Sequence, residues 1–199
     1  MKTIGIILRP FSENQKLFMG TRKDLFDALS CKNVNVLGIP ITNNFDNIIN
    51  VVNMCDGIIL SGGDNHIDND YKLVKYLYEK NIPTLGICLG MQAMGKVFNN
   101  YQEIKVFNHY NTNKYSHQIT IFKDTKLFNI LQKQNIKVNS RHKDAIPFTN
   151  LKISAISEDG VIEAIEDTNK KFFIGVEWHP ESLDDENSKK LFQEFINVL

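Results

Sequence analysis

A cysteine with a glycine two residues to either side carries the strongest chemical signal in this sequence. It lies in Gly86-Ile87-Cys88-Leu89-Gly90, between a short apolar run and a segment with helical spacing of apolar residues. At a sharp strand-to-helix turn the backbone folds back on itself, and glycine tolerates both the crowding and the unusual dihedral angles. Such a turn holds the sulfur at a helix N-terminus, where unpaired amides favour the thiolate. The sequence therefore predicts that Cys88 is a nucleophile.

A histidine and a glutamate near the C-terminus could assist this cysteine. The apolar run 172–176 is typical of a buried strand, and Glu177-Trp178-His179-Pro180-Glu181 follows it directly. A histidine just past a strand end can reach a sulfur across the sheet, and Glu181 can accept the proton of its other ring nitrogen. Glu177 is an alternative partner, because residues two apart on a strand point the same way. We expect His179 to be the base.

A double glycine could supply the third catalytic element. It ends the apolar run of Gly57-Ile58-Ile59-Leu60-Ser61-Gly62-Gly63-Asp64. Glycines at a strand end let backbone amides point into a cleft, as an oxyanion hole requires. The amide of Leu89, directly after the predicted nucleophile, is the natural second donor.

The other cysteines and histidines carry weaker signals. Cys31 and Cys55 each end a helical segment without flanking glycines, so we expect both to pack as small apolar residues. For His66, His109 and His117 we expect solvated or structural roles. No pair of His, Cys or Asp residues has zinc-ligand spacing on a shared element, so the sequence predicts no metal site and no cofactor.

Together these segments resemble class I glutamine amidotransferases, and within them the γ-glutamyl hydrolase branch, peptidase family C26. The resemblance covers nearly the whole chain and rests on the Gly-x-Cys-x-Gly-x-Gln and Trp-His-Pro-Glu elements in this order. Further matches lie at 4–6, 61–64, 138–142 and 159–166. The Asn-Ser-x-His and Asp-Gly-Val-Ile-Glu-Ala elements favour the hydrolases over synthetase-linked glutaminases.

The resemblance implies a role for each matching residue. It implies a catalytic triad with Cys88 as nucleophile, His179 as general base and acid, and Glu181 as the residue that orients His179. It also implies three oxyanion-hole donors, which are the backbone amides of Gly62, Gly63 and Leu89. It also implies residues that hold the α-amino and α-carboxylate groups of a γ-glutamyl unit, namely Gln92 and the backbone of Ser140, Arg141 and His142. For His142, structural support of its turn is an equal alternative.

The activity implied is hydrolysis of a γ-glutamyl amide, which releases L-glutamate through a γ-glutamyl thioester. As a compact chain taken as a whole, rather than by any single motif, the protein resembles small bacterial hydrolases of γ-glutamyl-CDP-amidate in capsular phosphoramidate synthesis. These enzymes release glutamate and cytidine diphosphoramidate. The alternatives are a glutaminase subunit that supplies ammonia to a synthetase, a hydrolase of γ-glutamyl amines, polyamines or folate polyglutamates, and a catalytically silent binding domain.

Charged residues of both signs are expected around the leaving group. The loop 10–20 should line the rim, and the loop 64–70 is short for this branch, so part of the usual rim could be missing. An anionic group would suit the basic candidates Arg9, Lys16, Arg22 and Arg141, although solvated surface charge is the favoured interpretation of Lys16 and Arg22. A cationic amine would suit Asp64, Asp68 and Asp70. The sequence does not decide between them.

The elements that position these residues follow an α/β pattern. Apolar runs at 3–8, 34–39, 57–60 and 84–87 alternate with amphipathic segments at 21–30, 45–54 and 70–80 and a helix after Cys88. This predicts a doubly wound, mostly parallel sheet of flavodoxin-like type. The C-terminal half predicts antiparallel strand additions at 116–122, 136–138, 151–157, 161–166 and 171–176, followed by a helix at 184–198.

Composition limits the classes of partner. The 199 residues suit a single domain over 1–199, with 23 basic and 23 acidic residues and no basic tract, which argues against nucleic acid. No apolar stretch approaches about 18 residues, so no membrane partner is expected. Three scattered cysteines favour a reducing compartment, and we expect a cytoplasmic protein with a small-molecule γ-glutamyl substrate. Nothing in the sequence indicates an oligomeric state.

Overall fold

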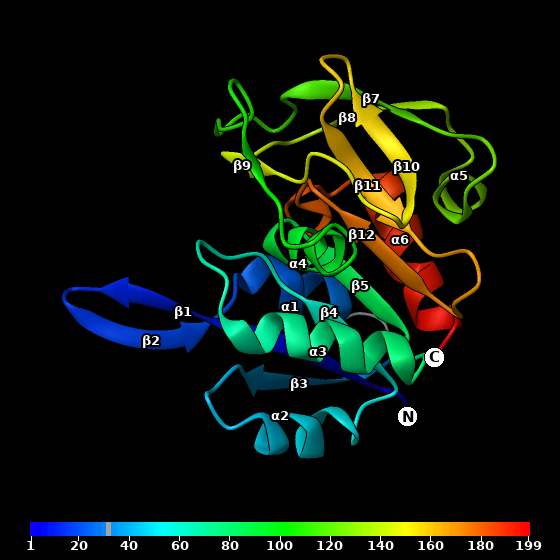
Figure 1. Cartoon of the computed structure of the whole chain (residues 1–199). Coiled ribbons are helices and arrows are strands. Elements are labelled where there is room, and N and C mark those ends of the chain that lie inside the picture. The colour runs from blue at the N-terminus through cyan, green and yellow to red at the C-terminus, as the bar shows by residue number, and fades with distance from the viewer. Residues whose placement is uncertain (31–32) are drawn as a thin grey trace.

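In the computed structural model, which describes residues 1–30 and 33–199, a ten-stranded sheet is covered by helices (Figure 1). Its strands are β1 (Thr3–Glu13), β2 (Lys16–Gly20), β3 (Asn35–Pro40), β4 (Gly57–Leu60), β5 (Thr84–Ile87), β7 (His117–Ile121), β8 (Asn135–Val138), β10 (Lys152–Ser157), β11 (Ile162–Glu166) and β12 (Phe173–Val176). A separate two-stranded sheet pairs β6 (Ile104–Lys105) with β9 (Asp144–Ala145).

The helices are α1 (Lys23–Ser30), α2 (Phe45–Val52), α3 (Asp68–Glu79), α4 (Leu89–Val97), α5 (Lys126–Leu131) and α6 (Glu186–Asn197), with a 3₁₀ turn at Pro180–Ser182. A membrane-spanning helix needs about 20 apolar residues. None of the helices in the described part of the chain has the length and apolar character to cross a membrane.

The order of the strands confirms the predicted fold class. β3, β1, β4, β5 and β12 run parallel, and β11, β10, β7 and β8 extend the sheet with antiparallel pairs. The architecture is α/β, with a mostly parallel central sheet and antiparallel additions from the C-terminal half.

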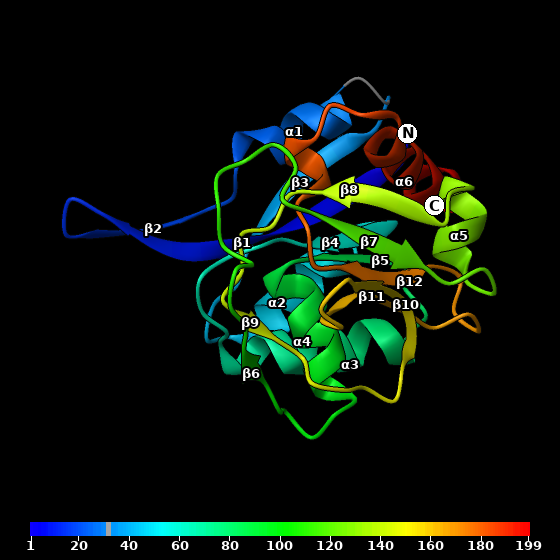
Figure 2. The ribbon, with the colours of Figure 1, turned by 90° about the horizontal axis from the view of Figure 1, so that it is seen from above.

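Both faces of the central strands are buried, which explains their continuous apolar runs. Along β4, Ile58 and Leu60 pack in the cluster that contains residues of α2, α3 and α4, whereas Ile59 packs in the cluster with residues of α1, α5 and α6. Figure 2 shows these two groups of helices on opposite sides of the sheet.

The parallel strands bring distant segments of the chain to one edge of the sheet. In the register of β5 and β12, Ile87 lies opposite Val176, and the amide of Cys88 donates a hydrogen bond of 2.8 Å to the carbonyl of Val176. The residues that follow β4, β5 and β12 therefore meet at the carboxyl ends of neighbouring strands, where open α/β sheets bind ligands.

The prediction of a loop at 10–20 is wrong, because β1 continues to Glu13 and pairs with β2 as an antiparallel hairpin. Asn14 and Gln15, both with positive φ, form its two-residue turn. Two positive φ angles match the twist of a hairpin but are usually marked by glycine, which is missing here. The hairpin projects from the body of the molecule (Figure 1).

The sequence also did not predict α5, β6 and β9. α5 has six residues and is capped by the Thr125 hydroxyl, which accepts a hydrogen bond from the amide of Phe128. Elements this short do not complete the periodic pattern on which a sequence-based assignment depends.

Candidate active site

Cys88 lies on a strained turn between β5 and α4. Its φ of 48° and ψ of −108° are unusual for a residue with a side chain. A Cβ atom at Gly90 would overlap the carbonyl oxygen of Leu60, and one at Gly86 would lie 2.9 Å from the amide nitrogen of Met91. The two glycines are therefore required by close backbone approach, as the sequence predicted, and the turn presents the sulfur to the cavity.

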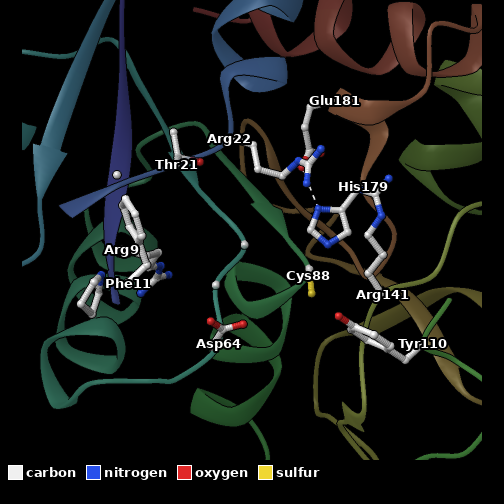
Figure 3. Close-up of a pocket in the computed structure, with 14 residues that line it drawn as sticks. Arg9, Phe11, Thr21, Arg22, Asp64, Cys88, Tyr110, Arg141, His179 and Glu181 are labelled. Carbon is white, nitrogen blue, oxygen red and sulfur yellow. Dashed lines mark hydrogen bonds and ion pairs between the residues drawn. The ribbon is translucent and has the colours of Figure 1, made fainter. Parts of the chain in front are cut away.

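The imidazole of His179 is held by Glu181 on one side. Its Nδ1 atom lies 2.7 Å from Oε1 of Glu181, which fixes the ring and leaves Nε2 on the other edge. Figure 3 shows the ring between Glu181 and the sulfur of Cys88. Glu177, the alternative partner, instead contacts Gln92 and His142 in the interior.

Asn139 anchors the backbone of this histidine. Its side-chain carbonyl accepts a hydrogen bond of 2.8 Å from the amide of His179, and its side-chain nitrogen donates one of 2.8 Å to the carbonyl of His179. Asn139 is completely buried. The sequence predicted no individual role for Asn139, although it lies in a matching motif, because its partner is 40 residues away.

The double glycine lies beside both catalytic candidates. A Cβ at Gly62 would lie 2.9 Å from Cε1 of His179 and 3.7 Å from Cβ of Cys88, so only glycine fits between them. Gly62 and Gly63 both line the cavity, and the backbone of Leu89 acts to lower the pKa of the Cys88 thiol. Gly62 therefore lies next to Cys88, and the role of Gly62, Gly63 and Leu89 as oxyanion donors stays a prediction.

Burial opposes the effect that the helix N-terminus is expected to have on the Cys88 thiol. Burial raises the pKa of the Cys88 thiol well above its usual value, and the nearby Glu177 and Glu181 raise it further. The amide of Leu89 acts in the opposite direction, but it is outweighed. Burial and the two carboxylates therefore favour the protonated thiol, and a base that accepts its proton would assist ionisation.

A cavity of about 380 Å³ opens in front of the sulfur (Figure 3). Its lining residues come from the hairpin and the segment directly after it, from the turns after β4 and β5, and from the segments between β6 and β7, between β8 and β9, and after β12. They are Arg9, Pro10, Phe11, Gly20, Thr21, Arg22, Gly62, Gly63, Asp64, Cys88, Tyr110, Arg141, His179 and Glu181. Phe11, Thr21 and Tyr110 had no sequence signal of their own.

Three of the four basic residues predicted at the rim line this cavity. Arg141 donates a hydrogen bond of 3.0 Å from Nη1 to the hydroxyl of Ser182. Arg22 is largely exposed and pairs with Asp24 at 2.8 Å. The fourth, Lys16, lies near the far end of the hairpin and is not among the lining residues.

Arg9 is buried and forms an ion pair with the equally buried Asp70. Its Nε also donates to the carbonyl of Ser61 at 3.3 Å. The suggestion that Asp70 could receive a cationic amine is therefore wrong, because a buried arginine already occupies this carboxylate. Of the three predicted rim carboxylates, Asp64 alone lines the cavity, since Asp68 lies in the first turn of α3.

The remaining predicted substrate residues lie deeper. Gln92 is buried and donates from Nε2 to Glu177 and, at 2.9 Å, to the carbonyl of Asp144. The Ser140 hydroxyl donates to the carbonyl of His109 at 2.5 Å. Neither Gln92, Ser140 nor His142 is among the lining residues, so their contact with a γ-glutamyl unit stays a prediction.

His142 belongs to a buried cluster of ionisable groups behind the cavity. Burial alone would lower its pKa, but the facing carboxylates of Glu177 and Glu163 raise it to about 9. Burial raises the pKa of Glu177 to about 8. For Glu163, burial is outweighed by three facing histidines, which hold its pKa below the usual value. The cluster therefore favours a cationic His142 next to an anionic Glu163.

The other cysteines take no part in this arrangement where they can be described. Cys55 is half-buried, its thiol lies 3.6 Å from the carbonyl of Val51, and burial raises its pKa, as expected for a packing residue. The prediction for Cys31 falls outside the described residues.

Comparison with known proteins gives the family. The family model for class-I glutamine amidotransferases matches residues 18–198. A glutamine amidotransferase-like protein of Rickettsia prowazekii is 31% identical over 221 aligned residues, which cover 74% of this chain and 79% of that protein. The glutamine-hydrolysing GMP synthase of Francisella tularensis is 34% identical over 144 residues, which cover 70% of this chain but 27% of the synthase.

Solved structures show the same fold at lower identity. The glutaminase domain of Trypanosoma brucei CTPS, with bound acivicin, superposes with a TM-score of 0.74 at 18% identity, covering 100% of this chain and 93% of that one. A glutamine amidotransferase of Thermotoga maritima gives 0.66 at 16% identity, covering 98% and 83%. Because the family model matches most of its length, the chain belongs to the class-I glutamine amidotransferase family.

Proposed function

We propose that this protein is a cysteine-dependent hydrolase of a γ-glutamyl amide. The observation that carries the proposal is the approach of three groups to one point: the Cys88 thiol on its strained turn, the imidazole of His179 bound by Glu181, and the backbone of Gly62–Gly63 between them. This is the arrangement that acyl transfer by a thiol needs.

In the proposed reaction the Cys88 sulfur attacks the δ-carbonyl carbon while His179 takes the thiol proton. Backbone amides of Gly63 and Leu89 hold the resulting oxyanion. The C–N bond breaks when His179 returns the proton to the departing nitrogen, which leaves a γ-glutamyl thioester and a free amine or amide. Water, deprotonated by His179, then hydrolyses the thioester to glutamate and the thiol.

We further propose that the leaving group is anionic, with a nucleotide amidate such as γ-glutamyl-CDP-amidate as the candidate. Arg22 and Arg141 line the cavity, and neither is buried in an ion pair, whereas the guanidinium of Arg9 is neutralised by Asp70. Guanidinium groups bind phosphate oxygens in a bidentate geometry. Asp64 is the opposing carboxylate on the same rim.

The second candidate is a glutaminase that supplies ammonia to a synthetase. It is supported by the similarity to a segment of GMP synthase and to the glutaminase domain of CTPS. In that case the substrate is glutamine, and turnover by the isolated chain should be slow until the partner is added. A catalytically silent binding domain would form no acyl-enzyme with any γ-glutamyl compound.

The test is glutamate release from a panel of substrates, with Cys88→Ala measured in parallel. The panel holds glutamine, a γ-glutamyl polyamine, a folate polyglutamate and γ-glutamyl-CDP-amidate. We expect rapid release from the nucleotide amidate and at least about 10⁵-fold loss in Cys88→Ala, as when a catalytic nucleophile is removed. Wild-type activity in Cys88→Ala would contradict the whole proposal.

Arg22→Gln separates the leaving group from the chemistry. Because Arg22 is largely exposed, its replacement should leave the fold intact. We expect KM for the nucleotide amidate to rise about tenfold, as for the loss of one charge-assisted hydrogen bond, with little change for glutamine. Equal changes for both substrates would contradict an anionic leaving group and favour the glutaminase.

A further inference from the structure

Three potential metal ligands meet in the buried cluster behind the cavity. His109 precedes the short bridge at Tyr110, His117 begins β7, and Glu163 lies in β11. One donor atom from each lies within 4.8 Å of the others. No sequence pattern indicates this site, because Glu163 lies on a different strand, 46 residues after His117.

The donor atoms of this cluster are incompletely paired. Oε1 of Glu163 lies 3.0 Å from Nε2 of His117 and 3.4 Å from Nδ1 of His109. Among the described residues, neither oxygen of Glu163 nor Nε2 of His117 has a partner with hydrogen-bond geometry, although all three atoms are buried. Buried polar atoms without partners are costly, so converging ones favour a shared proton or a bound ion between them.

A second layer of contacts orients His109. Its Nε2 atom lies 3.1 Å from Oδ2 of Asp159, and the hydroxyl of Ser157 donates to Oδ1 of Asp159 at 2.5 Å. A carboxylate on the outer nitrogen of a histidine fixes the tautomer that directs the other lone pair inward. Nδ1 of His109 is thereby directed toward Glu163 and His117.

We propose that Nδ1 of His109, Nε2 of His117 and the carboxylate of Glu163 bind a divalent first-row transition metal ion of the Zn²⁺ class. Two imidazoles and one carboxylate form a donor set that suits this class, and water can complete a tetrahedral shell. The ion would neutralise the negative charge of Glu163, whose two oxygens are otherwise left without hydrogen bonds.

Such an ion would tie together the segments that frame the cavity. The amide of His142 donates to the carbonyl of His109 at 3.1 Å, and Tyr110 pairs with Arg141 in a β-bridge. Tyr110 and Arg141 both line the cavity. By joining this loop to β7 and β11, the metal would order the rim of the active site without contact with the reacting atoms.

The competing explanation is a cluster held by a proton. Nε2 of His142 lies 3.1 Å from Nδ1 of His109 and 3.7 Å from Oε1 of Glu163, so a cationic His142 could satisfy both atoms. In that case the single proton on Nε2 of His142 is donated to Nδ1 of His109, the positive charge of His142 faces Glu163, and no metal is needed. The metal explanation requires His117 for binding of an ion, and the proton explanation does not.

The test is titration of the full chain with Zn²⁺ by calorimetry, after treatment with a chelator and its removal. All proteins carry Cys88→Ala, because a thiol beside His179 could itself bind zinc. We expect one ion per chain with a Kd of about 1 μM or tighter and a higher Tm with zinc. Binding of Co²⁺ should give the visible absorption of a site with nitrogen and oxygen ligands.

Two variants and a control make the test specific. His117→Gln removes a ligand and should weaken zinc binding at least about 100-fold. Asp159→Asn removes the outer carboxylate, which is 58% exposed and safe for folding, and should weaken binding about 10- to 100-fold. His66→Gln, a histidine outside the cluster, should bind zinc as the parent does. No saturable binding below about 100 μM, or equal affinity in His117→Gln, Asp159→Asn and the parent, would overturn the proposal.

Discussion

The hydrogen bond between His179 and Glu181 fixes the orientation of the imidazole ring relative to the sulfur of Cys88. The 2.7 Å contact involves Nδ1, so in the proposed reaction the atom that exchanges protons with Cys88 is Nε2. The raised pKa of the thiol makes this orientation important to the proposed reaction, because a thiol that favours its protonated form needs a base to accept its proton.

We therefore expect Glu181→Ala to lower kcat about 10³- to 10⁴-fold with a small change in KM. The loss should be at least about tenfold smaller than that of Cys88→Ala, because a poorly oriented histidine still accepts protons. Single-turnover glutamate release measures the rate of each of the two variants. Glu186→Ala, an exposed glutamate on α6, is the control and should keep the parental rate. A Glu181→Ala rate within tenfold of the parent would exclude an orienting role.

At the scale of elements, the turn between β5 and α4 depends on how closely α4 approaches β4. Gly90 lies against the carbonyl of Leu60, so the first turn of α4 rests directly on the backbone of the neighbouring strand. Backbone atoms cannot move aside as a flexible side chain can. The same contact holds the amide of Leu89 near the sulfur.

Gly90→Ala should consequently lower the free energy of unfolding by about 3 kcal/mol or more, or prevent folding, because overpacking against backbone costs more than against side chains. Gly160→Ala is the matched control. Gly160 has a φ of 87° and open space around it, so the added methyl should cost about 1 kcal/mol from backbone strain alone. Urea unfolding compares the two. Equal losses of unfolding free energy in the two variants would contradict the close contact between Gly90 and the carbonyl of Leu60.

At the scale of the whole molecule, the buried cluster links stability to pH. His142 has a pKa of about 9 in the folded chain and an ordinary value of 6.5 when unfolded. Its stabilising effect is therefore complete below pH 6.5 and is lost as the pH rises through about 9. Glu177, with a pKa of about 8, acts in the same direction, because above pH 4.5 the unfolded chain has released a proton that the folded chain retains.

We expect the free energy of unfolding to fall by about 4 to 5 kcal/mol between pH 6.5 and 9, with contributions of similar size from His142 and Glu177, since one pKa unit corresponds to about 1.4 kcal/mol. Urea unfolding of Cys88→Ala, with a chelator present, isolates the cluster from the thiol and from metal. Glu177→Gln should reduce the slope. His66→Gln should not, because the pKa of His66 is lowered to about 4 and it is neutral across this range. Constant or rising stability would contradict the charge state assigned to the cluster.

The features that the sequence alone determined are those set by neighbours along the chain. Glycines two residues from Cys88 report the local backbone of a turn, and the continuous apolar runs report strands buried on both faces. Both signals lie within a few residues of what they describe. The fold class, the turn at Cys88 and the segment that carries His179 could be predicted for this reason.

Tertiary structure decided which distant side chains became partners. It placed Glu177 against His142, paired Arg9 with Asp70, held the backbone of His179 with Asn139, and brought Glu163 to His109 and His117. These choices follow from the order of the strands in the sheet and from the paths of loops without periodic pattern. A one-dimensional sequence carries no local signal for either, because the contacts form only when the whole sheet is assembled.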